Sequence, residues 1–221
     1  MNDAEIIERW RANSEPWTRA VREGRIGSRL LATDAAIVEA VLGRKPATVL
    51  DIGCGEGWLA RALAAQGIDV LGVDAVADLV EKARRAGGGR FEVFSHEALA
   101  EGVLDERFDV CVCNFSLLGE ASVDRLLAKM PDLLTAGGAL IVQTLHPPTV
   151  DAAQPYRDGW REGSWCGIDA DFQAPAPWYF RTVESWVRLF VDSGLRIESL
   201  REPMHPRTFV PLSLILVGER T

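Results

Sequence analysis

The 221-residue sequence predicts an α/β protein with a doubly wound sheet of seven strands, the last of them antiparallel, preceded by N-terminal helices. Three observations predict this fold. Short apolar runs alternate with helical patterns, a glycine-rich turn follows the first run, and the final two runs are only eight residues apart. Such alternation builds right-handed crossovers and a parallel sheet, whereas so short a last connection requires antiparallel pairing.

The elements follow one another in a regular order up to residue 145. A helical region, 3–43, has weak breaks at 13–16 and 24–28. The pattern then predicts strands at 47–52, 68–74, 90–95, 108–114 and 139–145. It predicts helices at 57–67, 76–86 and 122–138, the last of which Pro131 should kink or split in two.

The character of the chain changes after Leu145. Residues 146–180 are rich in proline, glycine and aromatic side chains and show no clear period, which is typical of a functional or mobile loop. A helix at 181–194 and strands at 195–202 and 211–219 complete the sheet.

Composition narrows the class of partner. The chain has 24 basic and 32 acidic residues, so a nucleic acid is not expected as the main partner. The four cysteines lack framework spacing, which indicates reduced thiols. Acids near the start replace the basic region of a signal peptide, and there is no run of apolar residues long enough to span a membrane. These features predict a cytoplasmic protein without a membrane span, and they leave its oligomeric state open.

The stretch TVLDIGCGEGWLARALAAQG, residues 48–67, carries the clearest functional signal. Gly53, Gly55 and Gly57 let backbone approach a ligand closely, and the following helix presents free N–H groups to it. Asp74 ends the second predicted strand and can accept hydrogen bonds from two ribose hydroxyls. Because ligands bind at the carboxyl ends of such strands, turn and acid together predict an adenosine-containing ligand.

NAD and S-adenosylmethionine (SAM) both contain adenosine. A dinucleotide turn has a third glycine at the position that Trp58 occupies here. Asp51 adds a negative charge that suits an α-ammonium group, directly or through water, and repels a pyrophosphate. The residues therefore favour SAM.

The stretch VLDIGCGEGWLARALAAQGIDVLGVDA resembles the first two motifs of the class I SAM-dependent methyltransferases. The likeness is specific over 47–145, and a looser likeness at 181–197 is to the small-molecule members that act on ubiquinone precursors. It implies a Rossmann-like sheet in one domain, 1–221. In that domain, a helical N-terminal cap (1–45) precedes a SAM-binding core (46–145) and a substrate-side segment with the C-terminal hairpin (146–221).

The resemblance also implies a set of cofactor-binding residues. Those expected are Arg29, Asp51, Gly53, Cys54, Gly55, Gly57, Asp74, Ala75, His96, Glu97, Asn114 and Phe115. Within the set, Asp74 would hold the ribose, Ala75 and either His96 or Glu97 the adenine, and Asn114 would lie beneath the methionine part. Arg29 would match an arginine that some relatives place on the cofactor carboxylate.

Acceptor-side residues are predicted from their place after strands or in aromatic segments. His146 directly follows the fifth strand and could act as a general base. Substrate contacts are expected from Trp17, Trp165, Trp178, His205 and Arg207. No metal site is expected, since no cluster of Asp and His is visible in the sequence.

The function that these features predict is methyl transfer from SAM to an oxygen, nitrogen or carbon of a small molecule, by in-line displacement. Such a reaction depends mainly on alignment and on exclusion of water, so an obvious catalytic residue is not required. Two alternatives remain open: an NAD-dependent oxidoreductase, and a SAM-binding regulatory protein without catalysis.

Overall fold

A computed structural model describes residues 2–150, 153–166, 168 and 171–220. Its main sheet has seven strands in the order β3-β2-β1-β4-β5-β9-β8. The strands are β1 (Thr48–Ile52), β2 (Asp69–Asp74), β3 (Arg90–Val93), β4 (Phe108–Asn114), β5 (Leu134–Leu145), β8 (Leu195–Arg201) and β9 (Ser213–Arg220). β9 runs opposite to the other six strands and pairs antiparallel with both β5 and β8. The predicted doubly wound sheet with an antiparallel last strand is confirmed.

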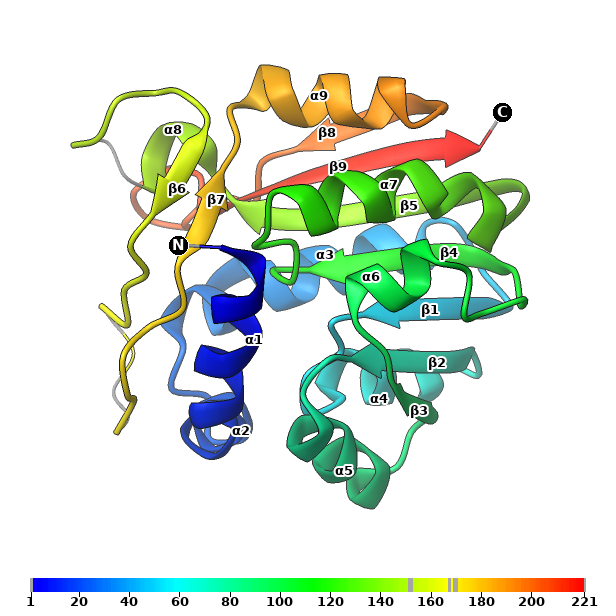
Figure 1. Cartoon of the computed structure of the whole chain (residues 1–221), viewed down its shortest axis with the longest axis horizontal. Coiled ribbons are helices and arrows are strands. Elements are labelled where there is room, and N and C mark those ends of the chain that lie inside the picture. The colour runs from blue at the N-terminus through cyan, green and yellow to red at the C-terminus, as the bar shows by residue number, and fades with distance from the viewer. Residues whose placement is uncertain (1, 151–152, 167, 169–170, 221) are drawn as a thin grey trace.

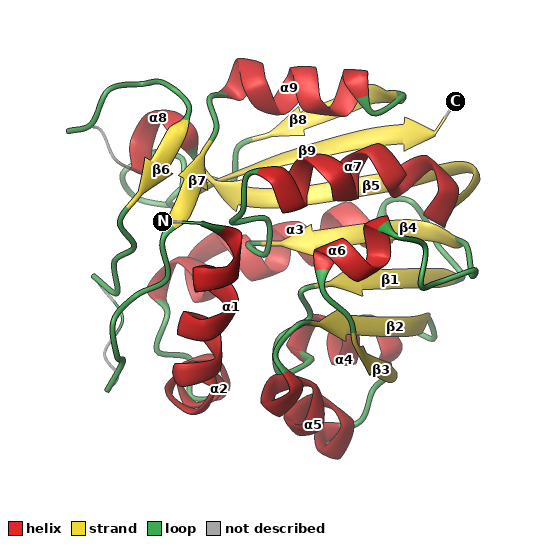
Figure 2. Ribbon diagram, viewed as in Figure 1, coloured by secondary structure: helices red, strands yellow, loops and turns green. Residues whose placement is uncertain are grey.

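Helices cover both faces of this sheet (Figure 2). The helical elements are α1 (Asp3–Ala12), α2 (Ser14–Arg22), the π-helical η1 (Arg29–Thr33), α3 (Asp34–Leu42), α4 (Trp58–Ala64), α5 (Ala77–Ala86), α6 (His96–Ala100), α7 (Ala121–Leu133), α8 (Pro147–Val150) and α9 (Val183–Asp192). One core cluster joins the sheet to α6, α7 and α9, and the other joins it to α3, α4 and α5. No helix in the described part of the chain has the length and apolarity that a bilayer crossing needs.

The two clusters follow from the alternation of side chains along each strand. On β1, Leu50 packs with α7 and α9 while Val49 packs with α3 and α4. Cys111 and Cys113 of β4 are fully buried in the same cluster as Leu50, as expected for small core residues. Strands that are covered on both faces are apolar throughout, which explains why the sequence shows continuous apolar runs.

The predicted extent of one helix was wrong. The expected helix over 122–138 ends at Leu133, two residues after Pro131, and Leu134 already belongs to β5. Pro131 thus lies in the last turn, and the helix ends two residues after it instead of continuing as a second piece.

Segment 146–180 contains regular structure that its lack of period did not reveal. The short helix α8 follows β5, and a two-stranded ladder pairs β6 (Gly159–Arg161) with β7 (Trp178–Phe180). The ladder has only three residue pairs, which are too few to give a recognisable pattern in the sequence.

The carboxyl ends of the parallel strands point toward α1, β6 and β7 (Figure 1, left side). Helix α1 has no fully buried residue, so apolar burial alone holds it weakly. Its attachment includes Asp3, whose two carboxylate oxygens accept the backbone N–H groups of Glu120 (3.0 Å) and Ser122 (2.7 Å). These N–H groups belong to the start of α7, which has no capping bond from its own N-cap side chain. Asp3 therefore caps α7 from a different helix.

We expect Asp3→Ala to cost about 1 kcal/mol of stability, the usual loss when a helix cap is removed. Partial burial works to raise the pKa of Asp3, but the two backbone bonds outweigh it and hold that pKa below its ordinary value. The contribution of Asp3 is therefore fully present at neutral pH and is lost as the pH falls below about 4. Urea unfolding at pH 7 and at pH 3 measures both effects.

The matched control is Glu8→Ala, which removes the same charge from an exposed position of the same helix. The capping role would be refuted if Asp3→Ala and Glu8→Ala destabilised the protein equally at pH 7.

Candidate functional site

The glycine turn after β1 adopts backbone conformations that ordinary residues avoid. Gly53 and Gly55 have φ values of +76° and +57°. A Cβ on Gly53 would lie 2.2 Å from the Cβ of Ser116, so the loop after β4 packs directly on this glycine. A Cβ on Gly55 would meet only the indole nitrogen of Trp17, at 3.6 Å, which shows that Gly55 faces open space. Gly53 is therefore needed for packing, and Gly55 leaves room beside the turn.

Gly57 has a different function from the other two glycines. It precedes α4, and a Cβ there would lie 2.9 Å from Ala83 of α5 and 3.1 Å from Phe91 of β3. Gly57 is not part of the cavity lining described below. Its small size lets α4 and α5 pack closely beside the turn.

Asp74 links the end of β2 to this turn. Its Oδ2 accepts the Gly55 N–H at 2.9 Å and its Oδ1 accepts the Val76 N–H at 2.8 Å. Burial raises the pKa of Asp74, and the backbone bonds oppose that rise in part. Each carboxylate oxygen has a second lone pair, so Asp74 can still accept hydrogen bonds from a ligand.

Asp51 lies behind the turn rather than in it. Its side chain is buried in β1, and its Oδ2 has no hydrogen-bond partner. Burial, and to a smaller extent the charge of Asp74, raise the pKa of Asp51 to about 7. Asp51 is absent from the cavity lining, so any effect on a bound cation would act through the electrostatic field or through water.

Glu56 was not recognised in the sequence, although it holds the turn against the N-terminal helices. Its carboxylate is almost fully buried and binds Arg22 of α2 at 2.8 Å and Arg61 of α4 at 2.7 Å. A buried carboxylate needs such partners, because desolvation without them is costly. The only signal for Glu56 in the sequence was an acidic residue inside the glycine turn. The sequence did not show that its partner would be Arg22, which lies 34 positions earlier in the chain.

Arg29 is held in place by two neighbours. Its Nε lies 2.9 Å from Oδ1 of Asp34, and its guanidinium carbon lies 4.4 Å from the centre of the Trp58 ring. The Arg29 side chain is mostly buried, yet both Arg29 and Trp58 line the cavity. Trp58, which occupies the position of the third glycine in a dinucleotide-binding turn, thus packs against the Arg29 cation.

A cavity of about 760 Å³ lies at the carboxyl ends of β1, β2 and β4. The structure brings together in its lining most of the predicted cofactor residues: Arg29, Gly53, Cys54, Gly55, Asp74, Ala75, His96, Glu97, Asn114 and Phe115. Oδ1 of Asn114 is buried without a partner at this surface. Burial lowers the pKa of His96, so this imidazole is neutral at pH 7.

The opposite wall of the cavity is aromatic. Trp17 and Trp165 line it as predicted, each packed against the ring of Trp10 at centroid distances of 5.0 and 5.6 Å. Trp165 also stacks on Phe172 at 4.1 Å. Oδ1 of Asn13, between α1 and α2, accepts the N–H of residue 173 at 2.7 Å. The N-terminal helices and segment 146–180 therefore form one continuous wall.

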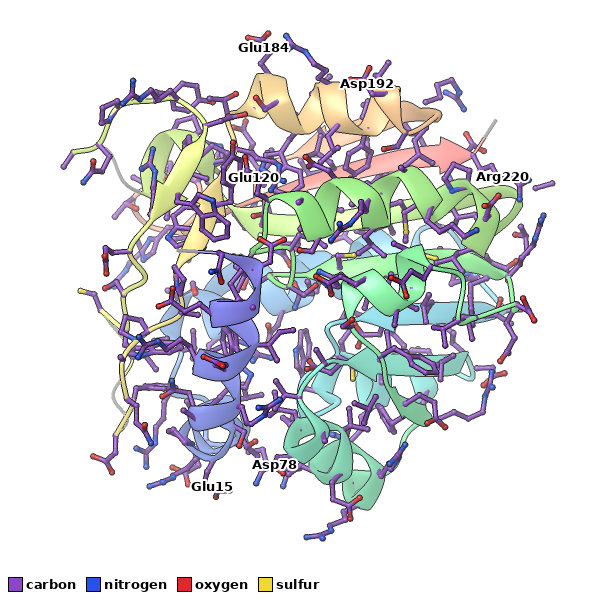
Figure 3. The ribbon with its side chains drawn as sticks, viewed as in Figure 1. Glu15, Asp78, Glu120, Glu184, Asp192 and Arg220 are labelled. Carbon is purple, nitrogen blue, oxygen red and sulfur yellow. The ribbon has the colours of Figure 1, made fainter. Side chains whose placement is uncertain are left out.

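Trp178 lines the same wall from β7, and the adjoining Arg181 fixes β7 to the rest of the fold. The buried Arg181 guanidinium donates to the carbonyls of Gly119 (2.8 Å) and Glu120 (2.9 Å) and to Asp124 (2.8 Å). Figure 3 labels Glu120 at the start of α7, where its carboxylate also accepts the Trp160 indole N–H at 3.1 Å. The β6–β7 base of the wall is thereby tied to the loop after β4.

Three predicted acceptor-side residues lie outside the lining. His146 is buried, with Nε2 2.7 Å from Glu202 and Nδ1 3.3 Å from the Thr149 hydroxyl. His205 uses Nδ1 to accept the backbone N–H of Arg207, whose side chain is exposed. The ring nitrogens of His146 are thus engaged away from the cavity, and the geometry gives no support to a general-base role for it.

In residues 2–150, 153–166, 168 and 171–220, no three His, Cys, Asp or Glu side chains gather closely enough to hold a metal ion.

The known proteins that this chain resembles are methyltransferases. The chain is 35% identical over 101 residues to a ubiquinone biosynthesis O-methyltransferase of Azorhizobium caulinodans, in an alignment that covers 44% of this chain and 40% of that protein. The chain therefore spans less than half the length of this curated relative.

Solved structures show the same fold. The magnesium protoporphyrin IX methyltransferase of Synechocystis PCC 6803, with bound S-adenosylhomocysteine, superposes with a TM-score of 0.70 at 17% identity and full coverage of both chains. A 1,6-didemethyltoxoflavin-N1-methyltransferase of Burkholderia thailandensis gives a TM-score of 0.68 at 19% identity, covering 99% of this chain and 88% of that one. A family model described as a methyltransferase domain matches residues 25–200. The match includes most of the sheet, the glycine turn and much of the cavity lining, and the chain belongs to the methyltransferase domain family.

Proposed function

We propose that the protein transfers a methyl group from SAM to a small-molecule acceptor that enters the same cavity. The observation that carries the proposal is the pairing of the open Gly55 position with the Asp74 carboxylate at the cavity surface. An adenosine ligand uses both features. Its two ribose hydroxyls donate hydrogen bonds to a carboxylate, and the adenosine needs a backbone that it can approach closely.

The residues at the cavity fit SAM by their chemistry. Asp74 would hold the ribose, while Ala75, His96 and Glu97 would surround the adenine. The unpartnered Oδ1 of Asn114 is suited to accept an N–H group of the cofactor's methionine part, beside Phe115.

Charge complementarity supports the same orientation. Arg29 offers a cation for the cofactor carboxylate, and the Asp51 carboxyl behind the turn favours a nearby ammonium group. Gly53, Cys54 and Gly55 would line the path between these ends. Gly57 would act indirectly, by keeping α4 close to the turn.

Bound SAM supplies a methyl carbon that its sulfonium has already activated. The protein's part is then to align the acceptor with that carbon and to keep water out. The aromatic wall provides apolar surface for this purpose, and ring faces are favourable neighbours for a sulfonium cation. His146 lies outside the lining, so the acceptor would have to be nucleophilic without help from that residue.

The alternatives receive less support. For a dinucleotide, the third-glycine position should allow close helix approach, whereas it holds Trp58 stacked on Arg29. For a purely regulatory SAM-binding protein, the aromatic wall beyond the cofactor residues would have no purpose.

We expect Asp74→Ala to weaken S-adenosylhomocysteine binding by roughly 2–3 kcal/mol, the usual worth of charge-assisted hydrogen bonds to one carboxylate. The variant should also unfold at a lower temperature without ligand, because the N–H groups of Gly55 and Val76 lose their acceptor. Titration calorimetry and thermal unfolding measure the two effects. Asp69→Ala, at the exposed opposite end of β2, is the matched control. An Asp74→Ala protein with an unchanged dissociation constant would place the ribose elsewhere.

Substitutions of Arg29 and Trp58 should weaken the binding only of ligands that carry a carboxylate. We expect Arg29→Leu to weaken S-adenosylhomocysteine binding by about 1.5–3 kcal/mol, and Trp58→Leu to weaken it less, by loosening Arg29. 5′-Methylthioadenosine lacks the amino-acid part, so its affinity should change little in either variant. Trp58→Phe keeps an aromatic face and should bind nearly as the parent protein does.

Calorimetry with the two ligands measures this difference. Equal losses for both ligands in Arg29→Leu would show that Arg29 supports the fold of the site rather than the carboxylate.

A further inference from the structure

We infer that the acceptor is a flat, conjugated ring system that carries no net charge when it binds. The inference deepens the proposed function, on which it rests, by naming the class of acceptor. Its basis is the contrast between the aromatic wall of the cavity and the few charged groups beside it.

The aromatic side chains of this wall come from separate parts of the chain. Trp10 and Trp17 project from α1 and α2, while Trp165 and Trp178 come from segment 146–180. Trp10 meets both Trp17 and Trp165 edge to face, with interplanar angles of 84° and 86°. Planar ligands gain from such walls because stacked and edge-to-face rings attract beyond their area of contact.

Charged groups on the acceptor side are already engaged or exposed. Both oxygens of Asp3 accept backbone N–H groups, and Arg181 binds two carbonyls and the Asp124 carboxylate. Glu162 lines the cavity with a side chain exposed to solvent. On this side of the cavity a charged acceptor would therefore lose water and find no buried, uncommitted partner among the described lining residues, since the Glu162 carboxylate is exposed and screened by solvent; this is unfavourable.

Helix α1 leaves an apolar stripe facing the cavity. Ile6, Ile7 and Trp10 form this stripe at the spacing of one helix face, with the Asp3 carboxylate at its N-terminal end, and none of these residues is fully buried. A flat apolar ligand would cover this stripe and supply the packing that the protein does not provide for it.

The test uses calorimetry on protein saturated with S-adenosylhomocysteine. The probes are 1-naphthol, its saturated counterpart decahydro-1-naphthol, the anion 1-hydroxy-2-naphthoate and the cation 1-naphthylmethylamine. We expect 1-naphthol to bind at least about tenfold more tightly than each of the others, since it alone is both planar and uncharged.

Variants connect this preference to the wall. Trp165→Leu and Trp178→Leu should weaken 1-naphthol binding roughly 2- to 10-fold and leave decahydro-1-naphthol within about twofold. The control is Phe209→Leu, which removes an exposed aromatic ring that does not line the cavity; it should leave 1-naphthol affinity unchanged.

Three outcomes would overturn the inference: no binding of 1-naphthol, equal binding of the saturated or charged probes, or equal losses in Phe209→Leu and Trp165→Leu. S-adenosylhomocysteine binding is measured first on the same protein. Its absence would refute the proposed function, and the acceptor inference with it. Cofactor binding with no preference for the planar probe would refute the acceptor inference alone.

Discussion

The hydrogen bond from the Gly55 amide to the Asp74 carboxylate, at 2.9 Å, is the constraint on which the site depends. It joins the end of β1 to the end of β2 and holds Gly55 at a positive φ with open space beside it. The packing of Ser116 on Gly53 adds the end of β4 to the same point. The carboxyl ends of three neighbouring strands therefore lie at one surface, and the cavity opens there.

Polar contacts attach the outer elements to this surface. Glu56 ties α2 to the turn through Arg22, Asp3 ties α1 to α7, and Arg181 ties β7 to the loop after β4. Each contact satisfies a buried or terminal polar group that would otherwise lack a partner. The cavity wall is thus anchored at a few points, while its inner aromatic surface stays available to a ligand.

Much of the fold could be predicted from the sequence because its signals are local. Apolar runs such as 108–114 show the parallel strands, and the short link expected between the last two strands favours an antiparallel hairpin. The glycine turn and Asp74 follow consecutive predicted strands, so their position at one ligand-binding edge was predicted, and the family model agrees with the resemblance that they carry.

The rest could not be predicted because it depends on contacts between distant segments. Nothing local indicates that Trp10 packs on Trp165, or that Glu56 binds Arg22. The position of His146 after β5 suggested a base, yet the side chain turns to Glu202 instead. Position along a strand fixes where a side chain starts, whereas tertiary packing decides where it points.

The most direct test of the account is a pair of calorimetric titrations on the unaltered protein, with S-adenosylhomocysteine and with NAD. The Asp74 and Gly55 arrangement, with Trp58 in place of a third glycine, predicts that S-adenosylhomocysteine binds at one site per chain with micromolar or tighter affinity. It also predicts no measurable binding of NAD. Tight binding of NAD without binding of S-adenosylhomocysteine would contradict the account.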